Sequence, residues 1–205
     1  MAYVLGFFAA DGSMTKNKRG SCFIEFSTVD KSILEDIKRA LDLEHIIASR
    51  NGGETNKVLF RLQIGSKDLF EDLLRLGMTS SKSKTLKFPT IPKKYLAHFV
   101  RGYFDGDGNV YGRKYQRKDR KNKMSISLSS GFTSGSRVFL EELQTNLVEN
   151  AFLKGGSLHY RSRAYRLYYS MNDSKKLYDF MYKSNESLYL ERKKNVFEKY
   201  ISMVE

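Results

Sequence analysis

The chain has 205 residues, of which 40% are hydrophobic, and it carries a formal net charge of +13 at pH 7. This length accommodates one large domain or two small ones, and the positive charge, shared by both halves, indicates a polyanionic partner such as nucleic acid. The single Cys22 excludes an internal disulfide, and three scattered histidines do not have the usual ligand spacing of a zinc site. With no apolar run of transmembrane length and no visible signal peptide, we expect no membrane association and an intracellular protein, in the cytoplasm or an organelle.

The first predicted element is a short apolar helix that runs from the N-terminus to Asp11. It is expected to end at Gly12, where a left-handed glycine commonly stops a helix. Gly6 and Ala10 are four residues apart and therefore share one face. Small side chains on one face let a second helix approach backbone to backbone.

Strands and helices alternate through the rest of the first half. Cys22, Ile24 and Phe26 occupy every second position, which is typical of a strand with one buried face. Residues 17–20 contain the turn before it. The expected elements are strands at 13–16 and 22–28, a helix at 30–43, strands at 45–50 and 57–64 around a turn at 51–53, and a helix at 66–76 ending at Gly77.

Residues 78–92 are expected to link two domains. This stretch holds both prolines of the chain, Pro89 and Pro92, together with several lysines. Pro92 stands at the start of the next helix, a position that proline favours. We therefore predict a first domain at 1–92, with its linker at about 78–92, and a second at 93–205.

The second half repeats the order of elements found in the first. A basic loop at 118–123 is longer than its counterpart at 17–20, and Asp173 is the expected N-cap of a late helix. The expected elements are a helix up to residue 107, strands at 110–117 and 124–130, a helix at 136–150, strands at 157–163 and 165–171, a helix at 173–182, and a final helix or pair of short helices at 186–204.

The first helix and the helix that opens the second half carry one pattern at a uniform offset of 96 residues. Both place an aspartate at the carboxyl end of the helix, where the helix dipole makes a carboxylate unfavourable by about 0.3–1 kcal/mol. If the helices pack through their small residues, the two carboxylates also repel each other. A bound divalent cation such as Mg²⁺ removes both penalties. The matched pairs are Gly6 and Gly102, Ala10 and Gly106, Asp11 and Asp107, and Gly12 and Gly108.

Two simpler interpretations compete with a metal site. An Asp-Gly pair after a helix is commonly only a helix stop, although two copies in register in a basic chain argue against that. The second interpretation is a calcium-binding loop that begins at Asp105. Such a loop requires a glycine where this chain has Val110 and a final glutamate where it has Gln116.

The paired stretches, residues 4–12 and 100–108, resemble the LAGLIDADG motifs of homing endonucleases in the single-chain form with two copies. The first copy departs at Ala9, where the family often has an acid and the second copy has Asp105; this is expected to weaken hydrogen bonding at that helix end. The resemblance implies an α+β fold of two pseudo-symmetric αββαββα repeats. In it, curved antiparallel sheets form a saddle, and the two motif helices pack at the centre.

The resemblance also implies a site-specific DNA endonuclease, associated with an intron or an intein, that hydrolyses both strands of a long asymmetric duplex. Its implied metal ligands and catalytic acids are Asp11 and Asp107, with the carbonyl oxygens of Ala10 and Gly106 as additional ligands. The implied cofactor is Mg²⁺ or another divalent cation such as Mn²⁺, whereas Ca²⁺ is expected to bind without supporting cleavage. Since both motifs lie in one chain, the expected form is a monomer.

The family usually places one lysine per half near the reacting water. In the first half the candidates are Lys82 and Lys84, and in the second half they are Lys193 and Lys194. Spacing to the next apolar residue, Leu86 or Phe197, favours Lys82 and Lys193 as the catalytic pair.

Polar and aromatic residues alternate along the predicted strands, which favours contact with double-stranded DNA over a merely solvated face. Arg, Tyr, Ser and Gln read base edges and phosphates, whereas solvated faces are commonly rich in Lys and Glu. The candidate DNA-binding residues are Lys18, Arg19, Arg50, Arg61, Gln63, Arg113, Arg117, Ser125, Ser127, Arg161, Arg163, Arg166 and Tyr168.

Two other functions remain open for a chain with this resemblance. Family members also act as maturases that assist the folding of an intron RNA, and others are catalytically silent DNA-binding regulators. Retention of both aspartates argues against a silent regulator, and nothing in the sequence selects RNA over DNA.

Overall fold

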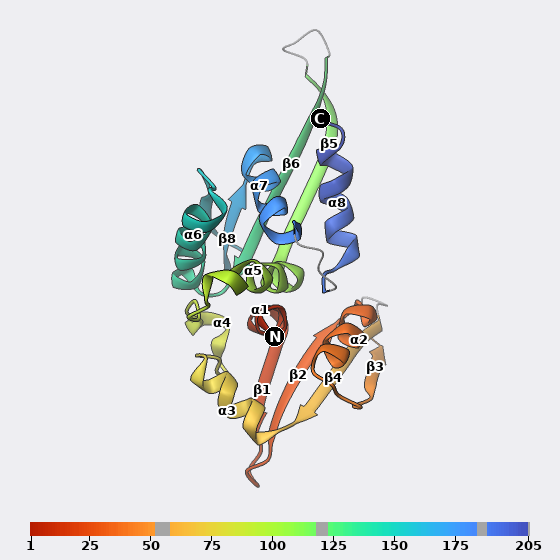
Figure 1. The fold of residues 1–205 in the computed structure, drawn as a ribbon, viewed down its shortest axis with the longest axis vertical. Helices are drawn as coiled ribbons and strands as arrows, with labels where there is room; N and C mark the ends of the chain where they lie inside the picture. The colour runs from red at the N-terminus through yellow and green to blue at the C-terminus, as the bar shows by residue number, and fades with distance from the viewer. Residues whose placement is uncertain (52–57, 118–122, 184–187, 205) are drawn as a thin grey trace.

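The computed structural model describes residues 1–51, 58–117, 123–183 and 188–204. It has an α+β fold in which two four-stranded antiparallel sheets flank a central pair of helices, as expected (Figure 1). The expected turn at 52–53, the basic loop at 118–122 and the start of the last helix at 186 lie outside the described residues.

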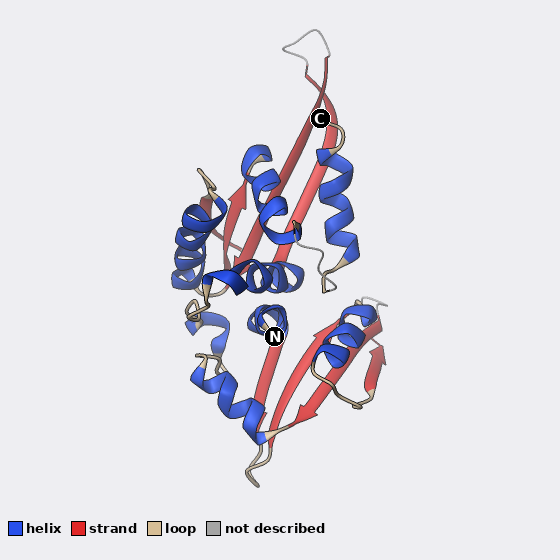
Figure 2. Cartoon of the chain, viewed as in Figure 1, coloured by secondary structure: helices blue, strands red, loops and turns tan. Residues whose placement is uncertain are grey.

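The first repeat follows the expected order of elements. Its sheet has the strand order β1-β2-β4-β3, and its helices cover one face of that sheet (Figure 2). The elements are α1 (Ala2–Asp11), β1 (Gly12–Lys16), β2 (Cys22–Thr28), α2 (Lys31–Ala40), β3 (Ile47–Asn51), β4 (Val58–Gly65) and α3 (Lys67–Arg75), followed by the linker helix α4 (Lys82–Thr85), which was not expected.

The second repeat has the same topology, with the strand order β5-β6-β8-β7. Among the described residues, no helix combines the length and apolar character needed to cross a membrane. The elements are α5 (Lys93–Asp107), β5 (Gly108–Arg117), β6 (Lys123–Ser134), α6 (Arg137–Ala151), β7 (Ser157–Arg161), β8 (Ala164–Tyr169), α7 (Met171–Tyr182) and α8 (Glu191–Ile201).

Helices α1 and α5 lie against each other between the two sheets (Figure 1). A Cβ atom at Gly6 would stand 2.1 Å from the carbonyl oxygen of Phe99, and one at Gly102 would stand 2.0 Å from that of Tyr3. Real Cβ atoms do not approach so closely, so the contact requires glycine on both helices. The predicted interface through small residues is therefore present, and it is reciprocal.

The glycines that end α1 and α5 differ from the expectation. Gly12 and Gly108 have φ of −76° and −85°, so both are extended rather than left-handed. A Cβ at Gly12 would lie 2.1 Å from the ring of Phe8, and one at Gly108 would lie 2.4 Å from the ring of Phe104. Glycine stands at these positions because an aromatic ring of the preceding turn occupies the space of a side chain.

Other element boundaries also moved. Helix α7 begins at Met171, so Asp173 lies inside its first turn and is not the cap; its carboxylate accepts from the amides of Lys154 and Gly155 at 3.1 and 2.8 Å. Ser162 and Arg163 have φ of 54° and 65°, which places Arg163 in the β7–β8 turn and not in a strand. Helix α2 ends at Ala40 because Asp42 is left-handed, with φ of 51°.

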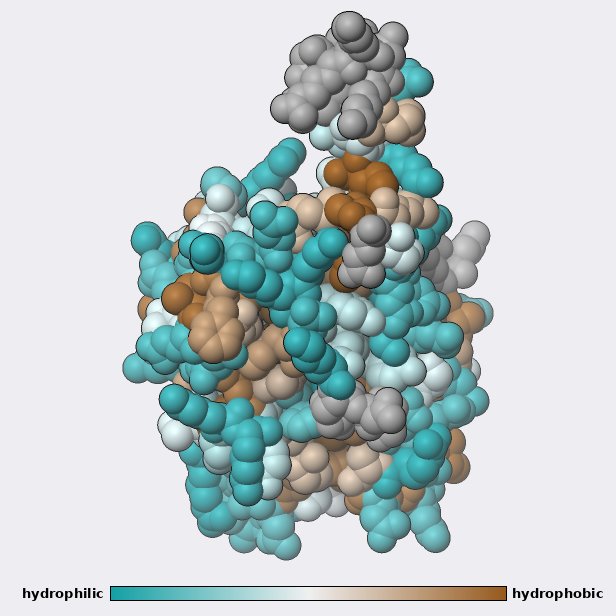
Figure 3. All heavy atoms as spheres, turned by 45° about the horizontal axis from the view of Figure 1, so that its top comes forward, coloured by the Kyte–Doolittle hydropathy of each residue, from teal (hydrophilic) through white to brown (hydrophobic). Residues whose placement is uncertain are grey.

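The β5–β6 hairpin extends away from the body of the molecule (Figure 1). Met124, on the same face of β6 as Leu128, is therefore 55% exposed, whereas Leu128 nearer the centre is 2% exposed. Elsewhere hydrophilic side chains cover much of the surface, with apolar patches between them (Figure 3).

We predict that Gly6→Ala or Gly102→Ala destabilises the fold by about 1–3 kcal/mol or more, because the added methyl group overpacks a backbone contact. Equilibrium denaturation in urea measures this change. Gly65→Ala is the matched control, since the nearest atom to its added Cβ would be a Phe23 ring carbon at 3.8 Å; its effect should stay within about 0.5 kcal/mol. Equal effects at Gly6 and Gly65 would contradict the close helix contact.

Candidate catalytic and nucleic-acid-binding site

The two helices place their terminal carboxylates next to each other. Asp11 ends α1 and Asp107 ends α5, and each is followed directly by the first strand of its own sheet. A Cβ at Gly106 would lie 2.4 Å from the Cβ of Ala10 and 3.3 Å from Oδ2 of Asp11. The close approach of the helices thus continues to their carboxyl ends and brings the acidic pair together.

The pKa values of both carboxyl groups reflect this crowding. Burial, and then repulsion from Asp11, raise the pKa of Asp107 to about 7, although Lys193 and Lys82 oppose the rise. Asp11 keeps an exposed edge, but the protein atoms around its carboxyl group still raise its pKa by desolvation, and Lys193 and Lys82 again act in the opposite direction. The site therefore holds two mutually repelling carboxylates between two lysines.

Lys82 and Lys193 occupy matching places in the two halves. The Lys82 ammonium donates to the carbonyl of Gly12 and lies 5.2 Å from the centroid of the Phe8 ring. The Lys193 ammonium donates to the carbonyl of Gly108 at 2.7 Å and lies 5.5 Å from the centroid of the Phe104 ring. Both side chains are buried, at 7% and 6% exposure, although lysine is almost never fully buried without a partner.

Lys193 is held by more carbonyl groups than Lys82. Its ammonium also lies 2.7, 2.8 and 3.1 Å from the carbonyl oxygens of Phe104, Asp105 and Gly106 in the last turn of α5. The Phe104 carbonyl additionally accepts from the Gly108 amide. A cation there interacts favourably with the helix dipole. Burial lowers the pKa of Lys193 to about 8, against the raising effect of Asp105 and the other nearby carboxylates.

The alternative lysines lie elsewhere. Lys84 is exposed, and the Lys194 ammonium lies 3.3 Å from a carboxylate oxygen of Glu198 and 4.6 Å from the centroid of the Tyr189 ring. The geometry therefore brings Lys82 and Lys193, rather than Lys84 and Lys194, to the acidic pair. Whether either lysine is catalytic stays a prediction, because both also serve as helix-end caps.

The donor atoms suit a hard divalent cation. Within the part of the chain that the structure describes, no group of three or more His, Cys, Asp or Glu side chains forms a metal cage. Mg²⁺ commonly binds through one or two carboxylates together with water and substrate phosphates, which fits an acidic pair open to solvent at Asp11. Of the predicted carbonyl ligands, that of Gly106 already faces the ammonium of Lys193.

Strand register places most of the predicted DNA-binding residues on the sheet faces away from the core. In the first sheet, Arg61 and Gln63 are exposed beside buried Leu62 and Ile64. In the second, Arg113 pairs with Ser127 and Tyr115 with Ser125, which puts both serines on the face of Arg113. The same register puts Arg161, Arg166 and Tyr168 on that face.

The remaining predicted contacts lie at loops and strand ends. Lys18 and Arg19 are exposed in the β1–β2 turn, Arg50 is exposed in β3, and Arg163 is exposed in the β7–β8 turn. The Arg117 side chain lies outside the described residues. Arg61 also forms an ion pair with Glu25 at 3.5 Å, so the face is not uniformly positive.

Sequence reasoning missed three polar side chains that join the repeats or hold α5. Buried Asp105 accepts from the Tyr3 hydroxyl across the helix interface. Buried Arg101 donates to the carbonyls of Met181 and Leu188 at 2.6 and 2.8 Å. Arg192 donates three hydrogen bonds, at 2.8–3.0 Å, to the Asp30 carboxylate of the first repeat. The one available signal was the difference between Ala9 and Asp105 in otherwise matched motifs.

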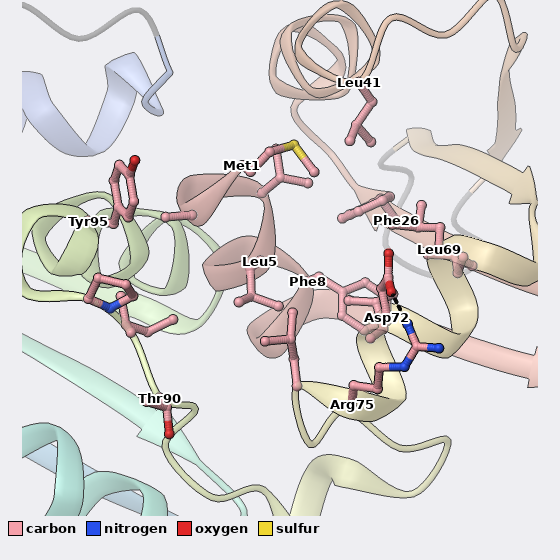
Figure 4. A pocket seen from close by; sticks show the side chains of 17 residues that line it. Met1, Leu5, Phe8, Phe26, Leu41, Leu69, Asp72, Arg75, Thr90 and Tyr95 are labelled. Atoms are coloured by element: carbon pink, nitrogen blue, oxygen red, sulfur yellow. Dashed lines mark hydrogen bonds and ion pairs between the residues drawn. The ribbon is translucent and has the colours of Figure 1, made fainter.

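An apolar cavity of about 480 Å³ lies on the other side of α1 and is separate from the acidic pair. Leu5, Phe8, Phe26, Leu41 and Leu69 point into it, and the ion-paired Asp72 and Arg75 stand at its edge (Figure 4). It holds none of the aspartates or lysines described above, so it supplies no groups for the chemistry of this site.

These features define a protein with two pseudo-symmetric repeats and paired acidic helix ends. Residues 1–78 match the family model described as a LAGLIDADG-like domain. This match covers most of the first repeat, and the chain as a whole shares the fold of solved LAGLIDADG homing endonucleases.

Several solved structures share this fold over almost the whole chain. The LAGLIDADG meganuclease I-AabMI bound to uncleaved DNA superposes with a TM-score of 0.61 at 17% identity, covering 98% of this chain and 88% of that one. The homing endonuclease I-WcaI bound to its DNA recognition sequence gives 0.63 at 16% identity, covering 96% and 84%. I-SmaMI bound to an uncleaved DNA target in the presence of calcium ions gives 0.62 at 13% identity, covering 98% and 89%.

Curated relatives match this chain over small parts of their own length. The DNA-directed RNA polymerase subunit Rpo1C of Methanocaldococcus jannaschii is 34% identical over 142 residues, 67% of this chain but 15% of the relative. Reverse gyrase from the same organism is 28% identical over 195 residues, 95% of this chain but 10% of the relative.

We predict that Asp107→Asn raises the melting temperature in EDTA by about 1–3 °C at pH 8, because it removes a carboxylate from the wrong end of a helix and from its like-charged partner. The folded-state pKa of about 7 exceeds the ordinary value, so the penalty is absent near pH 4, grows as pH rises, and is complete above pH 7. The increase in melting temperature caused by Asp107→Asn should therefore be absent near pH 4, grow as pH rises, and be complete above pH 7.

Asp68→Asn is the control for this measurement. Asp68 is an exposed aspartate in the first turn of α3, the favourable end of a helix, so its loss should lower the melting temperature slightly. If Asp107→Asn melts several degrees below the wild type in EDTA, Asp107 stabilises the fold and our assignment is wrong.

Proposed function

We propose that the chain is a divalent-metal-dependent endonuclease that hydrolyses both strands of a long, asymmetric duplex DNA site. The observation that carries this proposal is the acidic pair of Asp11 and Asp107, flanked by Lys82 and Lys193 in matching positions. A fold-stabilising role does not explain two adjacent carboxylates at the unfavourable ends of two helices. The DNA-bound neighbours with this fold support the same conclusion.

Hydrolysis of a phosphodiester adds water across the bond between phosphorus and one sugar oxygen. The water oxygen bonds to phosphorus, that phosphorus–oxygen bond breaks, and the leaving oxygen takes up a proton. A divalent cation, when bound, would offset the negative charge of the reacting phosphate and promote loss of a proton from water. Asp11 and Asp107 would hold the cation, with Mg²⁺ or Mn²⁺ supporting cleavage and Ca²⁺ supporting binding alone.

The two lysines supply positive charge beside the acidic pair. Lys193, with its pKa lowered to about 8, is suited to exchange a proton near neutral pH as well as to stabilise charge on the phosphate. Lys82, whose pKa burial also lowers, would serve the other strand. Each strand would thus have its own half-site, with one lysine and a share of the acidic pair.

The sheets would read the sequence of the duplex. The first sheet presents Arg61 and Gln63, and the second presents Arg, Tyr and Ser side chains. Because the two faces differ in composition, we infer an asymmetric target. Because both motifs are present in one chain, the working form would be a monomer. The relatives' names cover unrelated functions, and a segment shared by unrelated proteins favours a module carried by an intron or an intein.

We predict that Asp11→Asn and Asp107→Asn each lower double-strand cleavage by about 1000-fold or more, since the several kcal/mol of charge stabilisation that depend on the cation are lost. DNA binding should remain, because asparagine preserves the packing at the helix ends. Cleavage of a target selected from a randomised duplex library in Mg²⁺ measures the first effect, and binding without metal measures the second.

Asp68→Asn, far from the acidic pair in sequence and exposed on α3, is the control and should cut normally. Normal cleavage by either Asp11→Asn or Asp107→Asn would refute the assignment. Wild-type binding to structured RNA in preference to duplex DNA would favour a maturase, and tight DNA binding without any cleavage would favour a silent regulator.

We predict a steep dependence of duplex binding on salt, with a slope of log K against log salt of about −5 or steeper, because several phosphates are neutralised. Arg113→Ala should weaken binding to the selected target. Arg39→Ala is the control, because Arg39 is exposed on α2 and paired with Asp36, and it should leave binding unchanged. A shallow slope, or equal losses in both variants, would argue against the proposed contact face.

A further inference from the structure

One buried carboxylate links three elements of the molecule without belonging to the acidic pair. Asp105 is 2% exposed, and its Oδ2 accepts from the Tyr3 hydroxyl and from the Leu190 amide, both at 2.8 Å. Tyr3 belongs to α1, Asp105 to α5, and Leu190 directly precedes α8. Two short hydrogen bonds to one buried carboxylate oxygen therefore tether the start of α8 to both central helices.

The tether ends where the helix carrying Lys193 begins. The Leu190 carbonyl accepts from the amides of Lys193 and Lys194 at 3.0 and 3.2 Å, which forms the first turn of α8. Fixing Leu190 therefore fixes the backbone three residues before the buried lysine. Farther along α8, Phe197 packs against the rings of Phe104 and Tyr178, each with centroids 5.6 Å away.

The first repeat lacks both halves of this tether. The offset of 96 residues pairs Asp105 with Ala9 and Tyr3 with Phe99, so the acceptor and the hydroxyl donor are absent together. Lys193 and Lys82 differ by 111 positions, which pairs Leu190 with Thr79. The Thr79 carbonyl accepts from the Lys82 amide at 3.3 Å, the equivalent first turn, but a methyl group at Ala9 cannot accept from the Thr79 amide.

The two lysines consequently have unequal support. Lys82 lies on α4, a helix of 4 residues, whereas Lys193 lies on α8, a helix of 11 residues. Arg192, next to Lys193, is further held by Asp30 of the first repeat. A reacting group must be held within about 0.5 Å of its productive position, and a group that must first be ordered loses rate to that ordering.

We propose that Asp105, together with Tyr3, is a positioning residue that pre-organises the Lys193 half-site, so that the strand served by Lys193 is cleaved first. This inference rests on the proposed endonuclease function. The first hydrolysis gives a duplex nicked in that strand, and the Lys82 half-site then cuts the other strand. The order follows from the protein and not from the DNA sequence.

The experiment follows each strand of a duplex target labelled differently on its two strands. Lys193→Met and Lys82→Met first assign each strand to its lysine. In the wild type, the Lys193 strand should be cut about fivefold faster, the size of effect expected for one net hydrogen bond. Asp105→Asn and Tyr3→Phe should remove that advantage by slowing the Lys193 strand alone.

Tyr103→Phe is the matched control for these variants. Tyr103 is also a buried tyrosine of the α1–α5 interface, but its hydroxyl donates to the Thr133 carbonyl at 2.9 Å and not toward α8. Its loss should lower stability without changing the ratio of the two strand rates. Equal slowing of both strands by Asp105→Asn, or equal strand rates in the wild type, would overturn the ordered mechanism.

Hydrogen exchange of the metal-free protein provides a readout that needs no cleavage. Asp105→Asn and Tyr3→Phe should speed exchange of the amides in residues 190–197 by about fivefold and leave α6 unchanged. Unchanged exchange at 190–197 would overturn the tether. A wild type that cuts no duplex would refute the endonuclease proposal itself, while the exchange rates still decide whether Asp105 holds α8.

Discussion

The backbone contact between α1 and α5 is the constraint on which the rest of the structure depends. With Gly6 against the carbonyl of Phe99 and Gly102 against that of Tyr3, the helix axes can be close enough for their terminal carboxylates to meet. Because each helix passes directly into the first strand of its sheet, the same contact also sets the relation between the two sheets. Packing, electrostatics and the proposed contact faces therefore share one geometric origin.

The arrangement of charges at the site lowers the stability of the fold and suits the proposed chemistry. Two carboxylates at the negative ends of helix dipoles oppose each other, and the lysines that partly compensate are themselves buried and have lowered pKa values. A cation, a phosphate backbone, or both would relieve this arrangement, which explains why a positively charged protein would keep acidic residues at its centre. The arrangement is symmetric in its aspartates and lysines but asymmetric in what supports them.

Hydrophobic periodicity and turn residues predicted the element order because they are local signals, whereas the resemblance carried by the repeated motif implied the fold class. Sequence reasoning failed where spatial neighbours decide. Gly12 and Gly108 were expected to be left-handed, yet the Phe8 and Phe104 rings, four residues earlier, are the reason for glycine. Asp173 looks like a cap in sequence, but the amides of Lys154 and Gly155 are its partners.

Residues of the candidate site divide in the same way. Lys82 and Lys193 were favoured by spacing, and the structure brings both to the helix ends, but no pattern in the sequence distinguishes four carbonyl contacts from one. Tyr3 and Asp105 are 102 residues apart, so their hydrogen bond could not be read from local spacing. The prediction for Arg163 was wrong for a different reason. The alternation of polar and apolar residues placed it in a strand, but its positive φ places it in a turn.

The reciprocal glycine contact has a consequence for how such a chain can change over time. A substitution at Gly6 or Gly102 disturbs both halves at once, whereas a substitution on the outer face of one sheet leaves the other sheet untouched. The two halves can thus diverge in what they recognise, while the interface between α1 and α5, the seam of the molecule, must change little. A half from one chain joined to a half from another would need compatible partners mainly at this seam, at Tyr3 with Asp105, and at Asp30 with Arg192.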